Sequence, residues 1–449
     1  MAARHPAVPA GAVHRTRLPD RRRAHRASRA RRRDRVHQLR AHRRGVPRPG
    51  HRDHAPRVGA GARALRVPRR RRRRLRADRL AGARVSGGGR PLADIRLDGL
   101  TTTGEPPPRL RDVSLHVRYG ELFTVLGPPH SGKTALIRAV AGFLPLAAGR
   151  VLVDGRDVTA LPPAERSMGI VFQEGALWPH LSVRGHVAFG LEQQGMTAAD
   201  VEQRLAQVMR RLGLTDVERL RPDALSLEQR RRLALARALA TEPRVLLLDE
   251  PLAHLDPVTR KSLRLELAHL HRDLAVTTIH VTRDAADALA LSDRIAVLRD
   301  GAILQFGDVE QLYQRPASRV VAEALGPATF LPVRVVEVRD LGVVVETDAG
   351  AQVPVAGIGS FRTGDRGLLV MRPETLSLTE AMMGRGPGLP GRVTMRVFEG
   401  ARYLYEVDIN AGIPLRVEVT APSQTRIFRL GDAVRVECSS ETVVLVPET

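Results

Sequence analysis

The stretch Gly127-Pro128-Pro129-His130-Ser131-Gly132-Lys133-Thr134 decides the fold of this chain. The spacing of its glycines, lysine and hydroxyl group is typical of a loop that holds nucleotide phosphates. A continuous apolar run at residues 122–126 suits a strand buried on both faces, and residues 135–141 are expected to form a helix. The motif requires this order of strand, loop and helix. The sequence therefore predicts an α/β nucleotide-binding domain rather than a plain glycine turn before a helix.

Each part of the loop has an expected role. Gly127 and Gly132 allow backbone NH groups to point inward at phosphates, where the positive end of the helix dipole adds to the attraction. Lys133 is expected to reach the β- and γ-phosphates, and Thr134 to ligate Mg²⁺. Lys133 and Lys261 are the only lysines in an arginine-rich chain. A lysine kept in the loop suits a role that needs a compact ammonium group.

A pair of carboxylates follows a second apolar run. Residues 245–248 are Val-Leu-Leu-Leu, and Asp249 and Glu250 come directly after them. Ligands of open α/β sheets sit at this carboxyl end of the strands. Asp249 is therefore the expected Mg²⁺ partner, directly or through water, and Glu250 is the candidate general base for the attacking water. Residues 169–172 predict a short strand that ends at Gln173.

The charge of the chain is divided unevenly. The 449 residues carry a net charge of +24, but residues 1–90 hold 30 arginines, four aspartates and neither lysine nor glutamate, a balance of +26. The remainder is nearly neutral and gives no electrostatic argument for nucleic acid. A single cysteine, Cys438, fits a reducing compartment. No apolar run approaches the roughly 18 residues that span a bilayer, so we do not expect the chain itself to be a membrane channel.

Residues 1–90 contain no Phe, Tyr, Trp or Ile. Such a segment cannot bury enough apolar surface to offset the entropy of ordering, which predicts a disordered arm. The favoured interpretation is a start assigned too far upstream. The alternatives are a basic arm for nucleic acid or anionic lipid and a targeting segment, although a transit peptide is disfavoured because serine occurs only at positions 28 and 86.

Residues 91–327 are expected to form the nucleotide-binding domain. Alternation at 94–97 predicts an edge strand, which begins a mixed sheet with residues 113–117, the phosphate loop and residues 151–153. A helical insertion is expected at about residues 174–240. Its helices are predicted at 197–212, capped by Thr197, and at 228–239. The sheet resumes at Val245, and its further strands are predicted at 277–281 and 294–298.

Residues 328–449 are expected to form an all-β domain with OB-like barrels. Short alternating runs separated by turn residues suggest small barrels, and residues 379–391, rich in Gly and Pro, are expected to separate two halves. No catalytic constellation occurs in this part. The predicted strands are 333–338, 343–346, 368–371, 393–397, 405–409, 415–419 and 434–437.

The order of these motifs resembles that of the ATP-binding subunits of ABC importers, and most closely the group that serves polyamines, ferric iron and related periplasmic solutes. The resemblance covers about residues 92–449. Besides the phosphate loop and the acidic pair, it is carried by Val171-Phe172-Gln173, 176–180, Leu255-Asp256, Ser292-Asp293-Arg294, 305–307, 313–316 and Met371-Arg372-Pro373-Glu374. The last of these matches the family's appended β domain, known as TOBE. The implied fold is an ABC-type P-loop NTPase with a helical insertion, followed by this regulatory barrel domain.

The resemblance also implies a mechanism and partners. A homodimer would close on two ATP molecules and drive two membrane-spanning permease subunits. A periplasmic or lipid-anchored solute-binding protein would deliver the solute to these permeases. The chain would then lie peripherally on the cytoplasmic face of the bacterial inner membrane. Gln173 would sense Mg²⁺ and the attacking water, and Asp256 would signal across the dimer.

Three departures from the family pattern matter. Where the family has Leu-Ser-Gly-Gly-Gln to cap the partner's ATP, this chain has Leu225-Ser226-Leu227-Glu228-Gln229. Ser226 and Gln229 remain as expected ATP contacts, but both glycines are gone and Glu228 adds a carboxylate. Arg283 stands for the family's switch histidine near the γ-phosphate, and the aromatic that stacks on adenine is missing from residues 101–104.

Three functions therefore compete. The first is an ATPase subunit that energises import of a small solute. The second is a regulatory nucleotide-binding subunit that hardly hydrolyses ATP, favoured by Glu228 and Arg283. The third, an ABC ATPase acting on nucleic acid, is suggested only by the arginine-rich arm, and the β domain and the Gln173 segment argue against it.

Overall fold

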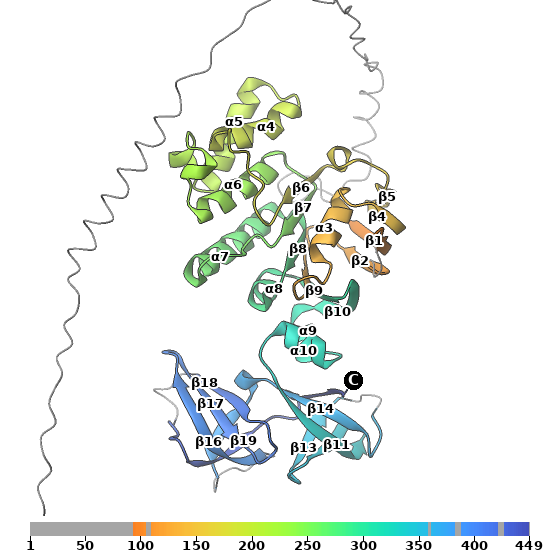
Figure 1. The fold of residues 1–449 in the computed structure, drawn as a ribbon, viewed down its shortest axis with the longest axis vertical. Coiled ribbons are helices and arrows are strands. Elements are labelled where there is room, and N and C mark those ends of the chain that lie inside the picture. Colours follow the sequence, from red (N-terminus) through yellow and green to blue (C-terminus); the bar gives the residue numbers. More distant parts are fainter. Residues whose placement is uncertain (1–92, 105–108, 358–360, 382–387, 421–425, 449) are drawn as a thin grey trace, which may run out of the picture. The chain divides into compact units, whose positions relative to one another are not determined.

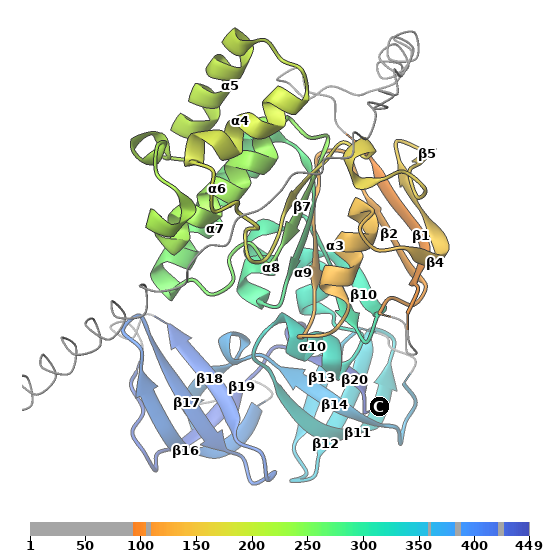
Figure 2. The same cartoon turned by 45° about the horizontal axis from the view of Figure 1, so that its top comes forward.

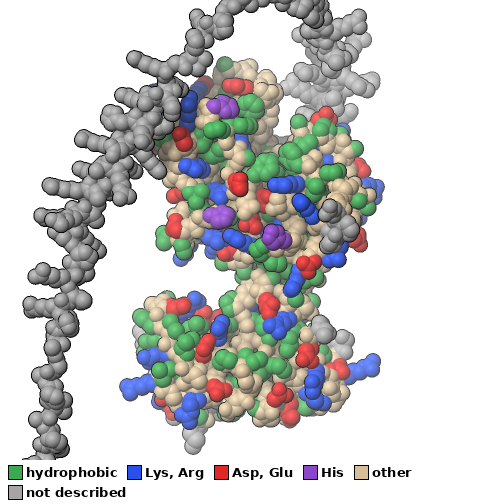
Figure 3. All heavy atoms as spheres, viewed as in Figure 1, with side chains coloured by type: hydrophobic (Ala, Val, Ile, Leu, Met, Phe, Trp, Pro, Cys, Tyr) green, Lys and Arg blue, Asp and Glu red, His purple; other side chains and the backbone are tan. Residues whose placement is uncertain are grey.

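The structure is a computed structural model that describes residues 93–104, 109–357, 361–381, 388–420 and 426–448. The predicted disordered arm at residues 1–90 lies outside the described residues. On the visible face of the described part, basic and acidic side chains are interspersed (Figure 3). This mixture agrees with the nearly neutral charge balance that the sequence gives for the residues after 90.

A six-stranded sheet carries the phosphate loop. Its strands are β3 (Leu122–Leu126), β6 (Met168–Val171), β7 (Val245–Asp249), β8 (Thr277–Thr282), β9 (Arg294–Arg299) and β10 (Ala302–Asp308). They lie in the order β10-β9-β3-β8-β7-β6, and all neighbours are parallel except β10 and β9. Every residue of β3 and β7 is buried, as expected for a parallel sheet covered on both faces. The carboxyl ends of β3, β7 and β8 therefore meet at one edge.

Alternate residues of β7 face two different cores. Val245 and Leu247 belong to the core that contains α3 (Lys133–Ala141), whereas Leu246 and Leu248 belong to the core on the opposite face. The second core holds α7 (Pro257–Leu274) and the three helices between β6 and β7, which are α4 (Val183–Gln193), α5 (Ala198–Arg211) and α6 (Leu227–Ala240). Figure 2 shows α3 on one side of β7 and α6 and α7 on the other. The helical insertion predicted from the sequence therefore lies between two neighbouring strands.

A separate antiparallel sheet covers α3 from outside (Figure 2). It contains β1 (Ile95–Thr102), β2 (Val113–Val117), β4 (Leu146–Val153) and β5 (Arg156–Asp157), in the order β2-β1-β4-β5. Two predictions were wrong here, because β1 is not an edge strand and these strands do not join the sheet of the phosphate loop. Ile95 and Leu97 are buried while Arg96 is exposed. Such alternation indicates that one face of the strand is exposed to solvent, but it does not indicate whether the strand has one neighbour or two.

The remaining helices follow the last strands of the central sheet. α8 (Ala285–Leu291) comes after β8, and α9 (Val309–Gln314) and α10 (Arg319–Leu325) come after β10 (Figure 1). No helix among the described ranges is long and apolar enough to cross a membrane.

The C-terminal strands form two five-stranded antiparallel sheets around one core. The first, in the order β13-β12-β11-β14-β20, contains β11 (Thr329–Arg339), β12 (Gly342–Thr347), β13 (Gln352–Ala356), β14 (Arg366–Met371) and β20 (Val444–Pro447). The second, in the order β15-β19-β16-β17-β18, contains β15 (Ser377–Glu380), β16 (Gly388–Phe398), β17 (Arg402–Asp408), β18 (Leu415–Thr420) and β19 (Ala433–Glu437). Residues 379–391 do not separate two halves, because β15 and β16 both pair with β19, and β20 returns to the first sheet.

A buried arginine joins α9 and α10 to the segment after β14. The Arg372 guanidinium donates to the carbonyl oxygens of Tyr313, at 3.3 Å, Ala322, at 3.5 Å, and Pro327, at 3.3 Å. Its central carbon also lies 3.7 Å from the centre of the Tyr313 ring, and the Tyr313 hydroxyl donates to Glu374. A planar guanidinium can satisfy several acceptors while stacking on a ring, which an ammonium group cannot do.

We predict that Arg372→Lys lowers the free energy of unfolding by about 2 kcal/mol, because the buried carbonyl oxygens lose their donors and the stacking contact is lost. Unfolding in urea measures this change. Arg366→Lys, at an exposed position on β14, is the matched control and should change stability by less than about 0.5 kcal/mol. Equal midpoints for the two variants would contradict the role given to Arg372.

Candidate active site

The phosphate loop joins the end of β3 to the start of α3. Gly132, the residue before α3, has φ 106°, in the left-handed region. A Cβ added to it would lie 2.5 Å from the carbonyl oxygen of Arg109, and one added to Gly127 would lie 2.2 Å from that of Leu298. Both glycines are therefore required by close backbone packing as well as by the turn. His130 also has positive φ, at 64°, a feature that its position in the motif did not indicate.

The Lys133 side chain folds back over the loop. Its Nζ donates to the carbonyl oxygens of Gly127, at 2.9 Å, and Pro128, at 2.7 Å. The side chain is only 5% exposed. Burial lowers the pKa of Lys133, while the carboxylates of Glu250 and Asp249 oppose that change. The ammonium group thus lies in an anion-binding loop, hydrogen-bonded to neutral carbonyl oxygens that a charged phosphate oxygen outcompetes.

Thr134 and Asp249 meet across the gap between α3 and β7. The Thr134 hydroxyl donates to Oδ1 of Asp249 at 3.2 Å, and Asp249 is 2% exposed. Burial raises the pKa of Asp249, and the hydrogen bond from Thr134 lowers it in part. A hydroxyl and a carboxylate side by side are hard oxygen donors of the kind that Mg²⁺ takes in phosphate sites. This donor set fits the two metal-binding roles predicted for Thr134 and Asp249.

The side chains of the predicted catalytic residues lie around the Glu250 carboxylate. Gln173 Nε2 donates to its Oε2 at 3.5 Å, Arg283 Nε lies 3.7 Å from the same oxygen, and Lys133 Nζ lies 3.9 Å from Oε1. Glu250 has φ 45°, and its backbone NH donates to the carbonyl oxygen of Val281 at 3.0 Å. A non-glycine residue in the left-handed region carries strain that recurs at functional sites. The four side chains come from four different segments of the chain, and the fold brings them together.

These groups line an open cavity of about 480 Å³. Its walls include Lys133, Thr134, Gln173, Glu250 and Arg283, all of which the sequence predicted. Arg109 and Arg138 also line the cavity, and the sequence did not indicate either of them. Arg138 lies one helical turn after Thr134 on α3, so helix periodicity could have found it, whereas Arg109 precedes β2 and no motif marks it. Four cationic side chains around one cavity suit a polyanion such as a nucleoside triphosphate.

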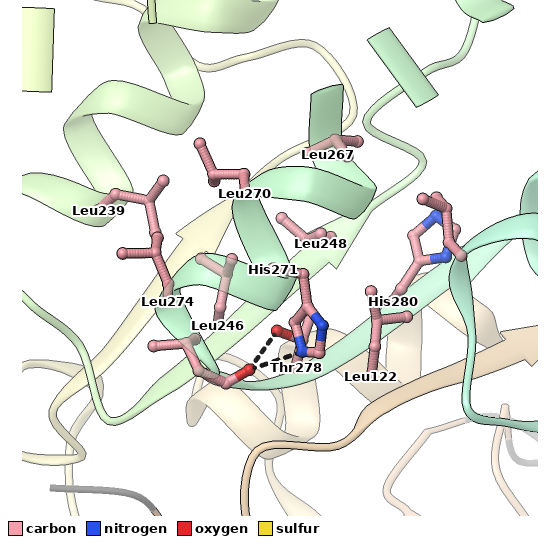
Figure 4. A pocket seen from close by; sticks show the side chains of 12 residues that line it. Leu122, Leu239, Leu246, Leu248, Leu267, Leu270, His271, Leu274, Thr278 and His280 are labelled. Carbon is pink, nitrogen blue, oxygen red and sulfur yellow. Dashed lines mark hydrogen bonds between the residues drawn. The ribbon is translucent and has the colours of Figure 1, made fainter. Parts of the chain in front are cut away.

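A second cavity lies beneath α7 and has a different chemistry (Figure 4). Leucines of α6, α7 and β7 form half of its wall. His280 also lines it, but burial lowers the pKa of that imidazole to about 3, so it is neutral. This cavity does not suit a charged ligand and belongs to the apolar core.

The altered motif at residues 225–229 lies at the start of α6. Ser226 caps the helix by accepting from the Gln229 NH at 3.1 Å, and the Gln229 side chain accepts from the Ser226 NH at 2.9 Å. Neither residue lines the cavity of its own chain. The Glu228 carboxylate is paired with Arg232 at 2.8 Å, one turn along the helix, and Arg232 also binds Glu266 at 2.9 Å. The extra carboxylate therefore shares one guanidinium with Glu266, which compensates its charge only in part.

A buried arginine links the helical insertion to both sides of the site. Arg231 on α6 is 6% exposed, and its guanidinium donates to the carbonyl oxygens of Gln173 and, at 3.2 Å, Ala253. The backbone next to the Gln173 side chain and the turn after Glu250 are thus fixed to the same side chain. Burial lowers the pKa of Arg231, but a guanidinium still keeps its charge.

Comparison with known proteins agrees with this geometry. The family profile described as "ABC transporter" matches residues 110–253, and the profile described as "TOBE domain" matches residues 369–446. The chain is 36% identical over 337 residues to the spermidine/putrescine import ATP-binding protein PotA of Nitrosomonas europaea, an alignment that covers 73% of this chain and 92% of that protein. This chain belongs to the family of ABC importer ATP-binding subunits. It is an ATPase subunit coupled to transport and acts with membrane permease subunits.

Other relatives extend the comparison. The PotA protein of Frankia alni is 38% identical over 378 residues, which cover 81% of each chain. The import ATP-binding protein PhnT of Salmonella typhimurium, whose name proposes 2-aminoethylphosphonate as its substrate, is 41% identical over 286 residues, covering 64% of this chain and 78% of that protein. Among solved structures, a dimer of the ABC transporter cassette MJ0796 is 27% identical and covers 48% of this chain and 98% of its own, with a TM-score of 0.45.

We predict that Glu250→Gln in this ABC importer ATPase keeps ATP binding and lowers turnover at least about 100-fold, the usual contribution of a general base. The amide keeps the shape of the side chain but cannot take a proton from water. Phosphate release and nucleotide titration measure the two properties separately. Glu310→Gln, at an exposed position on α9, is the control and should match wild type. Turnover within twofold of wild type in Glu250→Gln would remove Glu250 from the role of base.

Proposed function

We propose that the cavity above the phosphate loop binds Mg-ATP and that Glu250 directs its hydrolysis. The observation that carries this proposal is the meeting of Lys133, Gln173 and Arg283 around the Glu250 carboxylate, beside the Thr134 and Asp249 oxygens. The phosphate loop holds the β-phosphate with its NH groups, and Lys133 moves from the carbonyl oxygens to the phosphates. Glu250 then accepts a proton from the attacking water, which Gln173 orients.

The metal-binding roles rest on a matched set of oxygen donors. Thr134 Oγ1 and Asp249 Oδ1 lie 3.2 Å apart, and Gln173 Nε2 lies 3.5 Å from Oε2 of the neighbouring Glu250. These three residues would hold Mg²⁺, which when bound neutralises charge on the phosphate oxygens. Burial raises the pKa of Asp249, so its carboxylate gains most from a nearby cation.

A homodimer is the working form in this proposal. Ser226 and Gln229 lie outside the cavity of their own chain, so they can meet ATP only from a partner copy. The chain then sits on the cytoplasmic face of the bacterial inner membrane, where its permease subunits receive solute from a periplasmic or lipid-anchored binding protein. The names of the relatives support a small charged solute, since they include spermidine and putrescine on the one hand and 2-aminoethylphosphonate on the other.

The altered residues support slow hydrolysis within the transport function. Two charges about 4 Å apart at an effective dielectric near 20 interact by about 4 kcal/mol, which bounds the repulsion of a γ-phosphate by Glu228. The ion pair with Arg232 reduces that repulsion, and Arg283 supplies further positive charge. No contact among the described residues favours the alternative of a purely regulatory subunit.

The central test is Lys133→Ala. We predict that this variant loses Mg-ATP binding, because the loop loses its mobile cation while its backbone stays intact. Lys261→Ala removes the other lysine of the chain, exposed on α7, and should bind Mg-ATP as wild type does. Titration with a fluorescent ATP analogue compares the three proteins. Equal affinity in wild type and Lys133→Ala would refute the assignment of the loop.

A second test restores the family residues. We predict that Leu227→Gly, Glu228→Gly and Arg283→His together raise turnover by about tenfold or more, since 1.4 kcal/mol is tenfold in rate. The glycines let backbone NH groups approach a phosphate, and imidazole can shuttle a proton whereas guanidinium cannot. The double glycine variant without the histidine separates the two effects. If wild type already hydrolyses ATP as fast as the triple variant, the departures are neutral.

A further inference from the structure

Two helices begin shortly after the residues that meet at the Glu250 carboxylate. Glu250 leads through a tight turn, with the Ala253 NH donating to its carbonyl oxygen at 3.1 Å, to Asp256 at the start of α7. Arg283 is followed at once by Asp284, whose carboxylate caps α8 by accepting from the Asp287 NH at 2.9 Å. The placement of the two functional side chains therefore depends on how the first turns of α7 and α8 are held together.

Four charged side chains join the N-terminal halves of these two helices, and we call them the α7–α8 cluster: Arg260, Arg264, Asp284 and Asp287. Arg260 binds Asp284 at 3.1 Å and Asp287 at 2.5 Å. Arg264 binds the other oxygen of Asp287 through Nη2 at 2.7 Å and Nε at 2.8 Å. Both carboxylate oxygens of Asp287 are therefore bound by guanidinium groups of α7.

Burial and charge balance indicate that this cluster is rigid. The Asp287 side chain is 1% exposed, and those of Arg260 and Arg264 are 23% and 20% exposed. Two positive groups face two negative groups, so no charge is left without compensation. Such a buried arrangement adds little net stability because desolvation is costly, but its planar, multiply bonded geometry fixes the orientation of the two helices.

Arg283 has little else to fix it. Its side chain is 49% exposed, and Glu250, at 3.7 Å, is its ion-pair partner in the part of the chain that the structure describes. Its neighbours in sequence are anchored, since the Asp284 NH donates to Thr282 Oγ1 at 3.1 Å and the Asp284 carboxylate binds Arg260. An exposed side chain held at one end is positioned mainly by its backbone.

We propose that the α7–α8 cluster is a positioning device that sets Arg283 against Glu250. Asp287, Arg260 and Arg264 touch neither nucleotide nor water in this scheme and act only through the starts of the two helices. The proposal rests on the function proposed above for Glu250 and Arg283. It assigns a role to residues that lie outside the cavity lining.

A double-mutant cycle with the full-length chain tests this role. Asp287→Asn should lower the kcat for ATP about tenfold and leave the affinity for Mg-ATP within twofold of wild type, because the phosphate loop is untouched. In an Arg283→Ala background the same substitution should change kcat less than twofold, since no side chain remains to be positioned. Equal loss in both backgrounds would mean that Asp287 only supports the fold, which overturns the proposal.

A readout without turnover separates this proposal from the proposed function. Amide hydrogen exchange in peptides covering residues 282–290 should speed up at least about tenfold in Asp287→Asn, while peptides covering 94–102 stay unchanged. Unchanged exchange at 282–290 would overturn the positioning role, whatever the activity of wild type. A wild type that hydrolysed no ATP would instead count against the proposed function. Asp273→Asn, which breaks the 2.6 Å pair with Arg211 near the other end of α7, is the control and should leave both readouts unchanged.

If Asp287→Asn does not fold, Arg264→Lys replaces it in the same cycle. The lysine keeps the positive charge but loses the two-point contact with the Asp287 oxygen. A fall in kcat of about threefold that disappears in the Arg283→Ala background supports the device. An equal fall in both backgrounds overturns it.

Discussion

The site depends on two backbone hydrogen bonds at the carboxyl end of β8. The Gly127 NH donates to the carbonyl oxygen of Thr282 at 3.2 Å, and the Glu250 NH donates to that of Val281 at 3.0 Å. These bonds join the phosphate loop after β3 and the acidic pair after β7 to the strand between them. Because the three strands are parallel, their ends must meet at one edge, and the chemistry of the site follows from that constraint.

Electrostatics then distribute charge unevenly around this edge. Lys133, Arg109, Arg138 and Arg283 line the cavity, and Glu250 supplies the one carboxylate among the described residues of its wall. Burial acts on each sign in the opposite direction, lowering the pKa of Lys133 and raising that of Asp249. Both groups are therefore destabilised in their charged forms until a partner of opposite charge arrives. A nucleotide polyanion would supply that partner for the buried Lys133 ammonium, which favours its binding.

The sequence predicted the parallel strands of the central sheet and part of the cavity lining, because both depend on local patterns. Apolar runs identify strands buried on both faces, and the phosphate loop and acidic pair keep their meaning wherever the fold places them. The position of β1 could not be predicted, since alternation marks a half-buried strand but not its neighbours. Strand β13, with Pro354 at its centre, was missed because proline usually argues against a strand.

Long-range contacts were the part of the structure that the sequence could not reveal. Arg372 beneath Tyr313, and Asp287 between Arg260 and Arg264, become informative only when segments distant in the chain are neighbours. In a chain with 72 lysines and arginines, almost all of them arginine, no single arginine stands out by type. What distinguishes these residues is burial combined with several acceptors, a property of the folded state.

Arg283 stands where the family has its switch histidine, and this replacement changes the chemistry beside Glu250. A histidine at this place could alternate between donor and acceptor, whereas a guanidinium only donates and stays charged. Arg283 therefore places a permanent cation beside the Glu250 carboxylate, with its Nε 3.7 Å from Oε2. Because Asp284 and Asp287 are bound to α7 directly after Arg283, the backbone that carries this side chain is held by ion pairs, while the side chain itself is 49% exposed. A phosphate group in the cavity would compete with Glu250 for this guanidinium, because a phosphate oxygen and a carboxylate oxygen are charged acceptors of the same kind.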